Sequence, residues 1–323
     1  MNVNIISTVN GMENEGMRNI ATHMIKELEG MCTLRTSALG NPMQCVKNSF
    51  GADAVMIFAR ASAKTAYLAK LLRVICKRVY FVLVQKPEPV FLQKMGKSIP
   101  KYSYFSIIPE DGAPVEALGG TVRPLGVGIN SEKFRPAADA EEKAALRLKY
   151  GFTGERPVVV HVGHLSAGRG LEEFLNLPGD KYDRLVVASG MFQCDEVEKM
   201  LLCDGVRIHK GYLPDVSEVY RMADLYLFPT RSAEFVISIP LSVMEALSCG
   251  IPVVSFEGVA GIEVIKRSCD GGIYSVNDPS ELEDAAITAI NDNFGNFETL
   301  LRDKCTWNDV AKRFLDDISA DVK

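Results

Sequence analysis

Short runs of β-branched and apolar residues alternate along the chain with helix-length amphipathic stretches, and the whole pattern occurs twice. Strands separated by helices are typical of βαβ units, which assemble into parallel sheets. The chain has 323 residues, more than an ordinary domain of roughly 100–200 residues. The sequence therefore predicts an α/β fold with two doubly wound, Rossmann-like domains.

The first half predicts one such domain, residues 1–136. Its expected strands are Asn4–Ser7, Cys32–Thr36, Ala54–Phe58, Val79–Val84, Tyr104–Ile108 and Val122–Leu125. Its expected helices are Met17–Leu28, Ala63–Cys76 and Val90–Lys97. A charged helical stretch, Asp139–Tyr150, follows Pro136 and ends at Gly151, which is typical of a linker.

The second domain is expected over residues 137–306. Its first strand, Pro157–His161, is almost wholly β-branched, as is typical of a central parallel strand covered on both faces. Further strands are expected at Arg184–Ala188, Val206–His209, Leu225–Phe228 and Val253–Ser255. Helices are expected at Leu171–Leu175, Glu196–Leu202, Val216–Met222, Leu241–Leu247 and Pro279–Ile290. A last amphipathic helix, within 307–323, is expected to pack back on the first domain.

Composition and charge narrow the functional classes. A net charge of −5 and a pI near 5.6 give no general attraction to nucleic acid. No run reaches the roughly 20 apolar residues of a membrane span, so a cytoplasmic protein is expected. The eight cysteines lie far apart, without the spacing of metal or redox sites, and are expected to be reduced thiols.

One segment, residues 60–101, departs from the acidic average. Between Arg60 and Lys101 a single acid, Glu88, faces the cations Lys64, Lys70, Arg73, Lys77, Arg78, Lys86, Lys94 and Lys97. One interpretation is peripheral contact with an anionic membrane surface, which would suit a lipid-linked acceptor. The other is an ordinary amphipathic core helix with a solvated basic face. The sequence favours neither.

The turn after the first strand of the second domain suits an anion. It reads His161-Val-Gly-His-Leu-Ser-Ala-Gly-Arg-Gly170 and leads towards an expected helix at Leu171. Its glycines would let a phosphate approach backbone N–H groups, and Arg169 would add a fixed charge. The alternative is that the glycines only permit a tight turn and that Arg169 is a solvated cation.

The second informative stretch runs from Pro229 to Val254. A helix is expected to begin near Pro240, whose missing N–H costs nothing in the first turn, and to end at Gly250. Glu245 lies within this helix among apolar residues. It either faces solvent or enters a site where its carboxylate accepts hydrogen bonds, for which paired ribose hydroxyls would suit.

Together, these two stretches resemble glycosyltransferase family 4, the retaining group with the GT-B fold, in which two Rossmann-like domains face each other across a cleft. The family's phosphate-facing pattern matches Gly163, His164, Leu165, Arg169 and Gly170. The second half of its hallmark motif matches the stretch from Glu245 to Pro252. The run from Asp215 to Pro229 is similar as well.

The match departs from the family pattern at four places, two of which are conservative: His164 stands for the usual Arg and Arg169 for the usual Lys. The first glutamate of the hallmark motif is absent at strict spacing, where Ile237 stands, and Glu234 could replace it if the loop carries an insertion. The usual acceptor-side histidine has no counterpart in the first domain, whose single histidine, His23, is expected to be an ordinary helix residue.

The resemblance implies roles for particular residues. Arg169 and Glu234 are implied as catalytic, and the nucleotide sugar is expected to contact Gly16, Gly163, His164, Arg169, Gly211, Leu213, Ser238, Ile239 and Glu245. Within this set, Arg169 and His164 would bind the diphosphate, and Glu245 the ribose. Backbone groups of Gly211 to Leu213 would contact the base.

The resemblance also implies an activity, the transfer of a sugar with retention from a UDP- or GDP-sugar to a glycan or lipid-linked acceptor. No cofactor is expected, and no obligatory metal, because the sequence lacks the Asp-x-Asp signature of metal-dependent donors. Two alternatives stay open: an inactive donor-binding subunit of a glycosyltransferase complex, and a sugar-nucleotide epimerase or phosphorylase. A nicotinamide dehydrogenase is disfavoured because no Gly-x-Gly-x-x-Gly follows the first strand.

Overall fold

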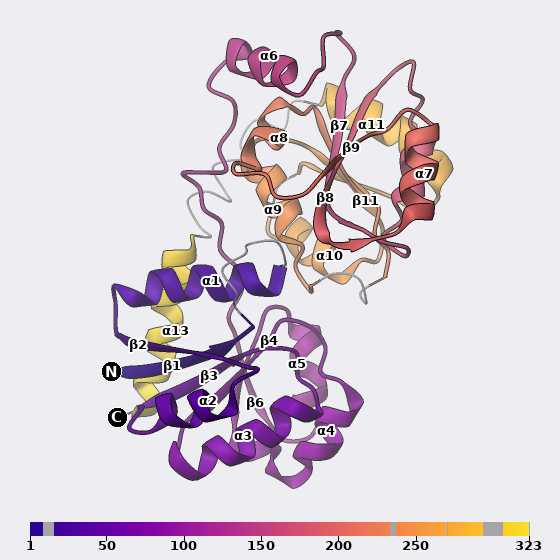
Figure 1. Cartoon of the computed structure of the whole chain (residues 1–323). Helices are drawn as coiled ribbons and strands as arrows, with labels where there is room; N and C mark the ends of the chain where they lie inside the picture. The colour runs from indigo at the N-terminus through magenta and orange to yellow at the C-terminus, as the bar shows by residue number, and fades with distance from the viewer. Residues whose placement is uncertain (9–15, 233–236, 270, 293–305, 323) are drawn as a thin grey trace. The chain divides into compact units, whose positions relative to one another are not determined.

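The computed structural model describes residues 1–8, 16–232, 237–269, 271–292 and 306–322. The chain divides into two compact units, each with its own six-stranded parallel sheet (Figure 1). The first unit comprises Met1–Gly128, Ile237–Ile239 and Cys305–Lys323, and the second Ile129–Val236 and Pro240–Lys304. The division at Gly128 precedes the expected boundary at Pro136.

The first sheet has the strand order β2-β1-β3-β4-β5-β6. Its strands are β1 (Asn2–Ser7), β2 (Thr33–Ala38), β3 (Ala54–Phe58), β4 (Val79–Leu83), β5 (Ser103–Ser106) and β6 (Thr121–Pro124). The helices are α1 (Gly16–Glu29), α2 (Pro42–Ser49), α3 (Ala63–Ile75), α4 (Pro89–Met95), the 3-10 helix η1 (Gly96–Lys101), α5 (Pro109–Glu116) and α13 (Trp307–Val322).

The core of the first unit lies against its central strands. Every residue of β3 and β4 is buried, because helices cover both faces of a parallel sheet. The Phe81 ring stacks on Tyr104 with centroids 5.5 Å apart and meets Phe91 edge-on at 5.0 Å. Helix α3 begins with a capping box between Ser62 and Thr65, which fixes its start.

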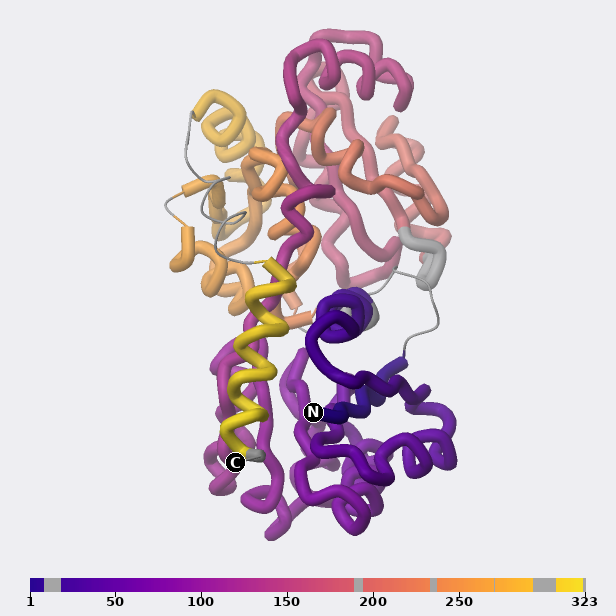
Figure 2. The backbone as a smooth tube through the Cα atoms, turned by 90° about the vertical axis from the view of Figure 1, so that its left-hand side faces the viewer, coloured from indigo at the N-terminus to yellow at the C-terminus, as the bar shows by residue number. Residues whose placement is uncertain are grey.

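The C-terminal helix α13 belongs to the first unit and runs along its sheet beside α1 (Figures 1 and 2). Its inner face buries Trp307, Val310, Ala311, Phe314 and Ile318. Phe314 meets Phe105 of β5 edge-on at 5.0 Å, and Trp307 stacks on His23 of α1 at 5.0 Å.

The second sheet has the strand order β12-β11-β10-β7-β8-β9. Its strands are β7 (Val158–Leu165), β8 (Asp183–Gln193), β9 (Arg207–Lys210), β10 (Leu225–Phe228), β11 (Val253–Phe256) and β12 (Ile273–Val276). The helices are α6 (Ala140–Lys149), the 3-10 helix η2 (Leu171–Asn176), α7 (Asp195–Cys203), α8 (Ser217–Met222), α9 (Leu241–Ser248), α10 (Ala260–Arg267), the 3-10 helix η4 (Pro279–Glu281) and α11 (Leu282–Asn291).

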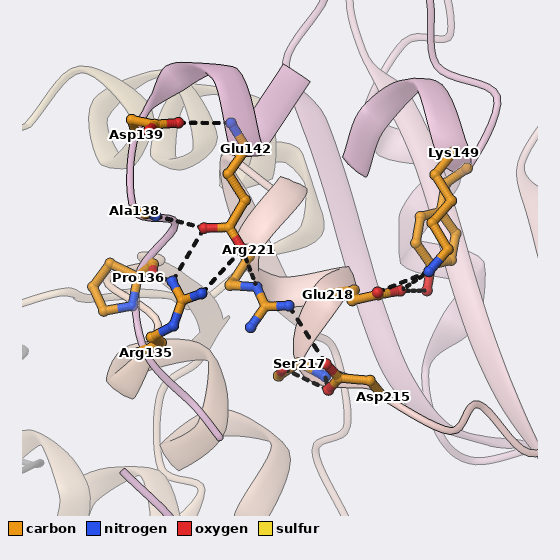
Figure 3. A network of polar contacts seen from close by, with 11 residues as sticks. Arg135, Pro136, Ala138, Asp139, Glu142, Lys149, Asp215, Ser217, Glu218 and Arg221 are labelled. Carbon is orange, nitrogen blue, oxygen red and sulfur yellow. Dashed lines mark hydrogen bonds and ion pairs between the residues drawn. The ribbon is translucent and has the colours of Figure 1, made fainter. Parts of the chain in front are cut away.

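An ion-pair network fixes α8 to the start of α6 (Figure 3). Arg135 makes a two-pronged contact with Glu142, at 3.1 and 3.2 Å. Arg221 forms an ion pair with the same carboxylate at 3.3 Å and another with Asp215 at 3.4 Å. Asp215 also accepts a hydrogen bond from the Ser217 hydroxyl at 2.6 Å. The segment that leads from β9 into α8 is therefore held in place by ion pairs and a hydrogen bond.

The fold-class prediction, α/β with two Rossmann-like doubly wound units, is confirmed. Five elements were not predicted, namely α2, η1, α5, α10 and β12. The helix expected at Leu171 is a 3-10 helix, and the strand expected to end at His161 continues to Leu165. The turn after β7 is therefore shorter than expected.

Two further expectations concern the helices and the thiols. Among the residues that the structure describes, every helix falls short of the length and apolar character that a membrane span requires. Within the described ranges, Cys32, Cys45, Cys76, Cys194, Cys203 and Cys249 are free thiols.

Candidate functional site

The strand order of the second sheet locates its candidate site. The chain winds outward from β7 in one direction through β8 and β9, and from β10 in the other through β11 and β12. β7 and β10 are therefore the neighbours at which the winding reverses. In open α/β sheets, ligands bind beyond the carboxyl ends of the strands at this point. The β7 turn and the residues after β10 lie there.

Two contacts join these segments. Gly170 has φ +72°, and a Cβ atom there would lie 2.5 Å from the carbonyl oxygen of Pro229. The hydroxyl of Thr230, which is fully buried, donates a hydrogen bond of 2.9 Å to the carbonyl oxygen of Arg169. Only glycine fits at position 170, because the backbone is left-handed and the neighbouring strand end is so close.

The Arg169 side chain lies at the centre of this corner. It is only 9% exposed, and its Nε atom has no hydrogen-bond partner. In the described part of the chain, no carboxylate forms an ion pair with it. Burial lowers the pKa of the guanidinium, which nevertheless stays charged at neutral pH. Arg169 is therefore not the solvated cation of the alternative interpretation.

Two histidines on β7 are held neutral. Burial, together with the Arg169 charge, lowers the pKa of His161 to about 3. Its Nδ1 lies 3.0 Å from the Leu227 carbonyl, which can only accept, so Nδ1 carries the proton. Burial and Arg169 also lower the pKa of His164 to about 4. His164 therefore offers a neutral polar group at pH 7, whereas Arg169 supplies the charge.

Gly163 makes room for one of these rings. A Cβ atom at Gly163 would lie 2.6 Å from Nε2 of His161. The missing side chain at position 163 thus lets the imidazole pack between β7 and β10, where it stacks on Tyr226 at 5.8 Å. This close approach is a structural reason for the glycine besides the predicted contact with a phosphate.

Glu245 lies on α9, the helix that the sequence predicted to begin near Pro240 and to end at Gly250. Pro240 caps the helix, and Gly250 has φ +75°. The Glu245 carboxylate is partly buried and accepts a hydrogen bond of 2.8 Å from the Tyr220 hydroxyl. It is therefore not the fully solvated helix residue of the alternative interpretation.

The predicted base-binding segment follows β9. The Gly211 N–H donates to the Ala188 carbonyl at 3.0 Å and is therefore engaged. Leu213 is partly buried, whereas Tyr212 between them is 68% exposed. The Arg221–Asp215 ion pair fixes the end of this segment.

The remaining predicted residues lie elsewhere. Ser238 and Ile239 belong to the first unit, and the Ser238 N–H donates to the Val84 carbonyl at 3.2 Å. Gly16 is the first residue of α1, also in the first unit. Glu234 lies outside the described residues. The structure thus brings together Gly163, His164, Arg169 and Glu245 in one corner of the second unit.

Four residues of this corner were not predicted, namely His161, Tyr220, Tyr226 and Thr230. His161 and Tyr226 lie within strands, where the sequence alone does not distinguish a site residue with a polar ring from an ordinary core residue. A signal was available for Tyr220, since it stands in the run that resembles the family. Its contact with Glu245, 25 residues away in sequence, required the fold.

The arrangement is chemically suited to an anion. Arg169 is buried at the strand switch point, and among the described residues no carboxylate pairs with its guanidinium. Removing an unpaired charge from water is costly, so such a cation is normally matched by a negative group. No group of three or more potential metal ligands occurs among the described residues.

Comparisons with known proteins show which families this chain resembles. The family model described as glycosyl transferases group 1 matches residues 156–292. The sulfoquinovosyl transferase SQD2 of Arabidopsis thaliana is 28% identical over 62% of this chain and 38% of its own. The N,N′-diacetylbacillosaminyl-diphospho-undecaprenol α-1,3-N-acetylgalactosaminyltransferase of Campylobacter jejuni is 27% identical over 45% of this chain and 38% of its own.

The chain thus spans well under half of each of these two relatives. The solved structure of Anabaena HepE in complex with UDP-glucose has a TM-score of 0.79 and 14% identity, and the match covers 99% of this chain and 100% of HepE. This likeness establishes the fold. The site corner, from β7 to α9, lies within residues 156–292, the segment that is similar to the glycosyl transferases group 1 family model.

Proposed function

We propose that this chain transfers a sugar from a nucleoside-diphosphate sugar to an acceptor hydroxyl. The observation that carries the proposal is the buried guanidinium of Arg169 at the β7–β10 switch point, with which no carboxylate of the described residues pairs. A diphosphate would provide the missing negative charge. Glu245, on helix α9 after β10, would accept hydrogen bonds from the ribose hydroxyls.

The same geometry suits the chemistry of transfer. When the anomeric bond breaks, negative charge develops on the leaving diphosphate. A cation already fixed beside those oxygens stabilises the transition state more than the ground state, because it needs no reorganisation. The removal of one such donor costs about 3 kcal/mol, which is roughly a 100-fold loss of turnover.

Relatives support the choice of substrates. HepE was crystallised with UDP-glucose, so we propose a UDP-sugar as the first donor to test, with GDP-sugars beside it. The Campylobacter relative is named for a sugar on diphospho-undecaprenol, which supports a lipid-linked acceptor. We further propose that the donor needs no divalent cation, since Arg169 supplies the charge at the diphosphate.

Purified protein tests the proposal directly. UDP-glucose, UDP-N-acetylgalactosamine and GDP-mannose are incubated with extracts of lipid-linked glycans, with and without EDTA, and nucleotide release is measured. Arg169→Ala should lower turnover about 100-fold, whereas Arg267→Ala, an exposed arginine of the same unit, should not. A loss below threefold in Arg169→Ala would contradict the assignment.

The same experiment separates the alternatives. Nucleotide binding in a thermal-shift assay without turnover would indicate the inactive donor-binding subunit. Interconversion of two UDP-sugars without an acceptor would indicate an epimerase. If no nucleotide stabilises the wild-type protein, the donor site itself is wrong.

The second part of the proposal concerns the acceptor side, where residues 60–101 carry an exposed basic and apolar surface. On α3, Thr65, Ala66, Ala69 and Leu72 are buried. The opposite face exposes Tyr67 (57%), Leu71 (51%) and Val74 (82%). The stripe formed by these three residues is flanked by the exposed cations Lys64, Lys70 and Lys77.

Neighbouring cations extend this surface. Lys94 of α4 lies over the Tyr67 ring at 5.7 Å, and the Lys70 ammonium donates to the Lys94 carbonyl at 2.6 Å. Glu88, the single acid of the segment, is already paired with Arg60 at 3.0 Å. An apolar stripe within a field of cations suits the interface of an anionic bilayer, where each cation contributes about 1 kcal/mol.

Vesicle sedimentation tests the membrane contact. The wild-type protein should bind vesicles that contain phosphatidylglycerol and not pure phosphatidylcholine. Charge reversal at Lys70, Arg73 and Lys77 should abolish binding, and Leu71→Ser with Val74→Ser should weaken it. The control variant reverses Lys26 and Lys47, which are exposed elsewhere in the same unit. If both charge-reversed variants lose vesicle binding equally, binding depends only on the overall charge, and the proposed membrane-contact surface is wrong.

A further inference from the structure

A buried tyrosine lies directly behind the Glu245 carboxylate. Tyr220 of α8 is fully buried, and its hydroxyl donates a hydrogen bond of 2.8 Å to Oε2 of Glu245. Burial and the neighbouring carboxylate raise the pKa of Tyr220 well above its ordinary value. The phenol is therefore a permanent donor, and it is aimed at this carboxylate.

A second tyrosine holds the same helix. Tyr226 of β10 donates from its hydroxyl to the Val162 carbonyl at 3.2 Å and also forms a hydrogen bond with the side chain of Ser242. Ser242 and Glu245 are three residues apart on α9, so both lie on one face of the helix. The Tyr220 and Tyr226 rings contact each other at 5.7 Å. One face of α9 is thus held at two points by buried hydroxyls.

Tyr220 is itself firmly placed. Its ring packs edge-on against Phe134 at 5.9 Å, and the next residue, Arg221, is fixed by its ion pairs with Glu142 and Asp215. Helix α8 therefore connects the end of the predicted base-binding segment with the predicted ribose-binding carboxylate. A donor on so rigid a support can fix the direction of the group that it contacts.

We propose that Tyr220 is a positioning residue that sets the orientation in which Glu245 accepts the ribose hydroxyls, an inference that rests on the proposed function. A glutamate side chain that was free to rotate would have to be ordered when the nucleotide binds, and the affinity would fall by that cost. The hydrogen bond from Tyr220 removes part of the cost in advance. Tyr220 acts only through Glu245 and touches neither the sugar nor the diphosphate.

Nucleotide analogues test this role. Binding of UDP and of 2′,3′-dideoxy-UDP is measured by calorimetry, with GDP and its dideoxy analogue beside them. The wild-type protein should prefer the hydroxylated nucleotide about tenfold or more, because the hydroxyls bind a charged acceptor. In Tyr220→Phe this preference should fall at least about fivefold, while the affinity for the dideoxy nucleotide stays the same.

Matched variants make the result specific. Tyr274→Phe removes another tyrosine–carboxylate hydrogen bond of the same unit, to Asp292 at 2.6 Å, and should leave the preference unchanged. In Glu245→Ala the preference should be absent, and adding Tyr220→Phe should change nothing further. If Tyr220→Phe weakens both nucleotides equally, or neither, Tyr220 has no positioning role.

A double-mutant cycle tests the link between the two side chains without a ligand. Unfolding in urea is measured for Tyr220→Phe, Glu245→Ala and the double variant. Coupling of at least about fivefold in the unfolding equilibrium supports the link, and additive effects overturn it. If the wild-type protein binds neither UDP nor GDP, the proposed function fails, and the cycle still decides whether Tyr220 and Glu245 act together.

Discussion

Thr230 and Arg169 are joined across the β7–β10 switch point by a hydrogen bond of 2.9 Å from the Thr230 hydroxyl to the Arg169 carbonyl. The bond fixes the backbone of the β7 turn to the residues after β10. The Arg169 side chain is buried, and within the described ranges no carboxylate pairs with it, so its charge is in place before any ligand arrives. Such preorganisation is what stabilisation of a developing anion requires.

A first prediction follows for Arg169→Met. An unpaired buried cation is costly, so its removal should leave the free energy of unfolding unchanged or raise it by up to about 2 kcal/mol, while turnover falls about 100-fold. The control is Arg184→Met. Arg184 is also buried but donates to the Asp204 carboxylate at 2.6 Å and to the Leu177 carbonyl at 2.9 Å, so its loss should destabilise by about 3–5 kcal/mol. Urea unfolding measures both variants, and strong destabilisation by Arg169→Met would show that its charge is compensated.

Gly170→Ala provides a second prediction. The substitution meets both a left-handed backbone, φ +72°, and the Pro229 carbonyl at 2.5 Å. Gly258 has φ +78° with open space around it, so Gly258→Ala measures the backbone cost alone, about 1 kcal/mol. We expect Gly170→Ala to cost about 1–3 kcal/mol more, from the forced shift of the strand ends, and to weaken nucleotide binding as well. Equal costs in the two variants would mean that the Pro229 contact is easily relaxed.

Much of the fold could be predicted because both sheets are parallel and buried. Runs such as Val158–Val160 and Ala54–Phe58 are apolar throughout, and only strands covered on both faces need that. The elements that were missed are short. Helix α2 carried a usable signal, since Asn41 caps it and Pro42 begins it. Strand β12 has four residues with an uneven burial pattern, and so short an apolar run does not distinguish strand from helix.

The candidate site was predictable only where the residues adjoin in sequence. The β7 turn and α9 could be identified as separate motifs, but their meeting at the switch point depends on strand order. The neutral state of His164 depends on burial beside Arg169, which no motif records. The Tyr220–Glu245 contact depends on how α8 packs against α9. Packing between elements, rather than local pattern, sets the electrostatics of the site.

The pH dependence of stability provides a third prediction. Burial lowers the pKa of His161 to about 3 and of His164 to about 4, against about 6.5 in the unfolded chain. Below pH 6.5 the unfolded chain therefore binds more protons, and stability falls as the pH drops. One buried histidine contributes a slope of up to about 1.4 kcal/mol per pH unit, and His164 contributes less because it is partly exposed.

The measurement is urea unfolding between pH 4.5 and 7.5, with His164→Gln beside the wild-type protein. Protonation of carboxylates also lowers the stability of the folded protein in acid. The difference between the pH profiles of the wild type and the variant therefore isolates the contribution of His164. The variant should be relatively more stable towards low pH. Parallel profiles over the whole range would contradict the lowered pKa of His164.

The last prediction concerns the attachment of α13 to the first unit. The Asp321 carboxylate accepts two hydrogen bonds from Arg123, at 2.7 and 2.8 Å, and one from the Tyr80 hydroxyl at 2.8 Å. Arg123 holds the pKa of Asp321 below its ordinary value, so the stabilisation is present at neutral pH and is lost as the pH falls below about 4. Asp321→Asn should lower the free energy of unfolding by roughly 1–2 kcal/mol at pH 7, and the difference from wild type should shrink in acid. Asp316→Asn, at an exposed position of the same helix, should change neither quantity.

Amide hydrogen exchange shows how far the effect of the Asp321 contacts extends. Because the buried face of α13 completes the core around Phe105, loss of these contacts should increase exchange along β5 and β6. Exchange that increases only in the last turn of α13 would show that the carboxylate secures no more than the end of the helix.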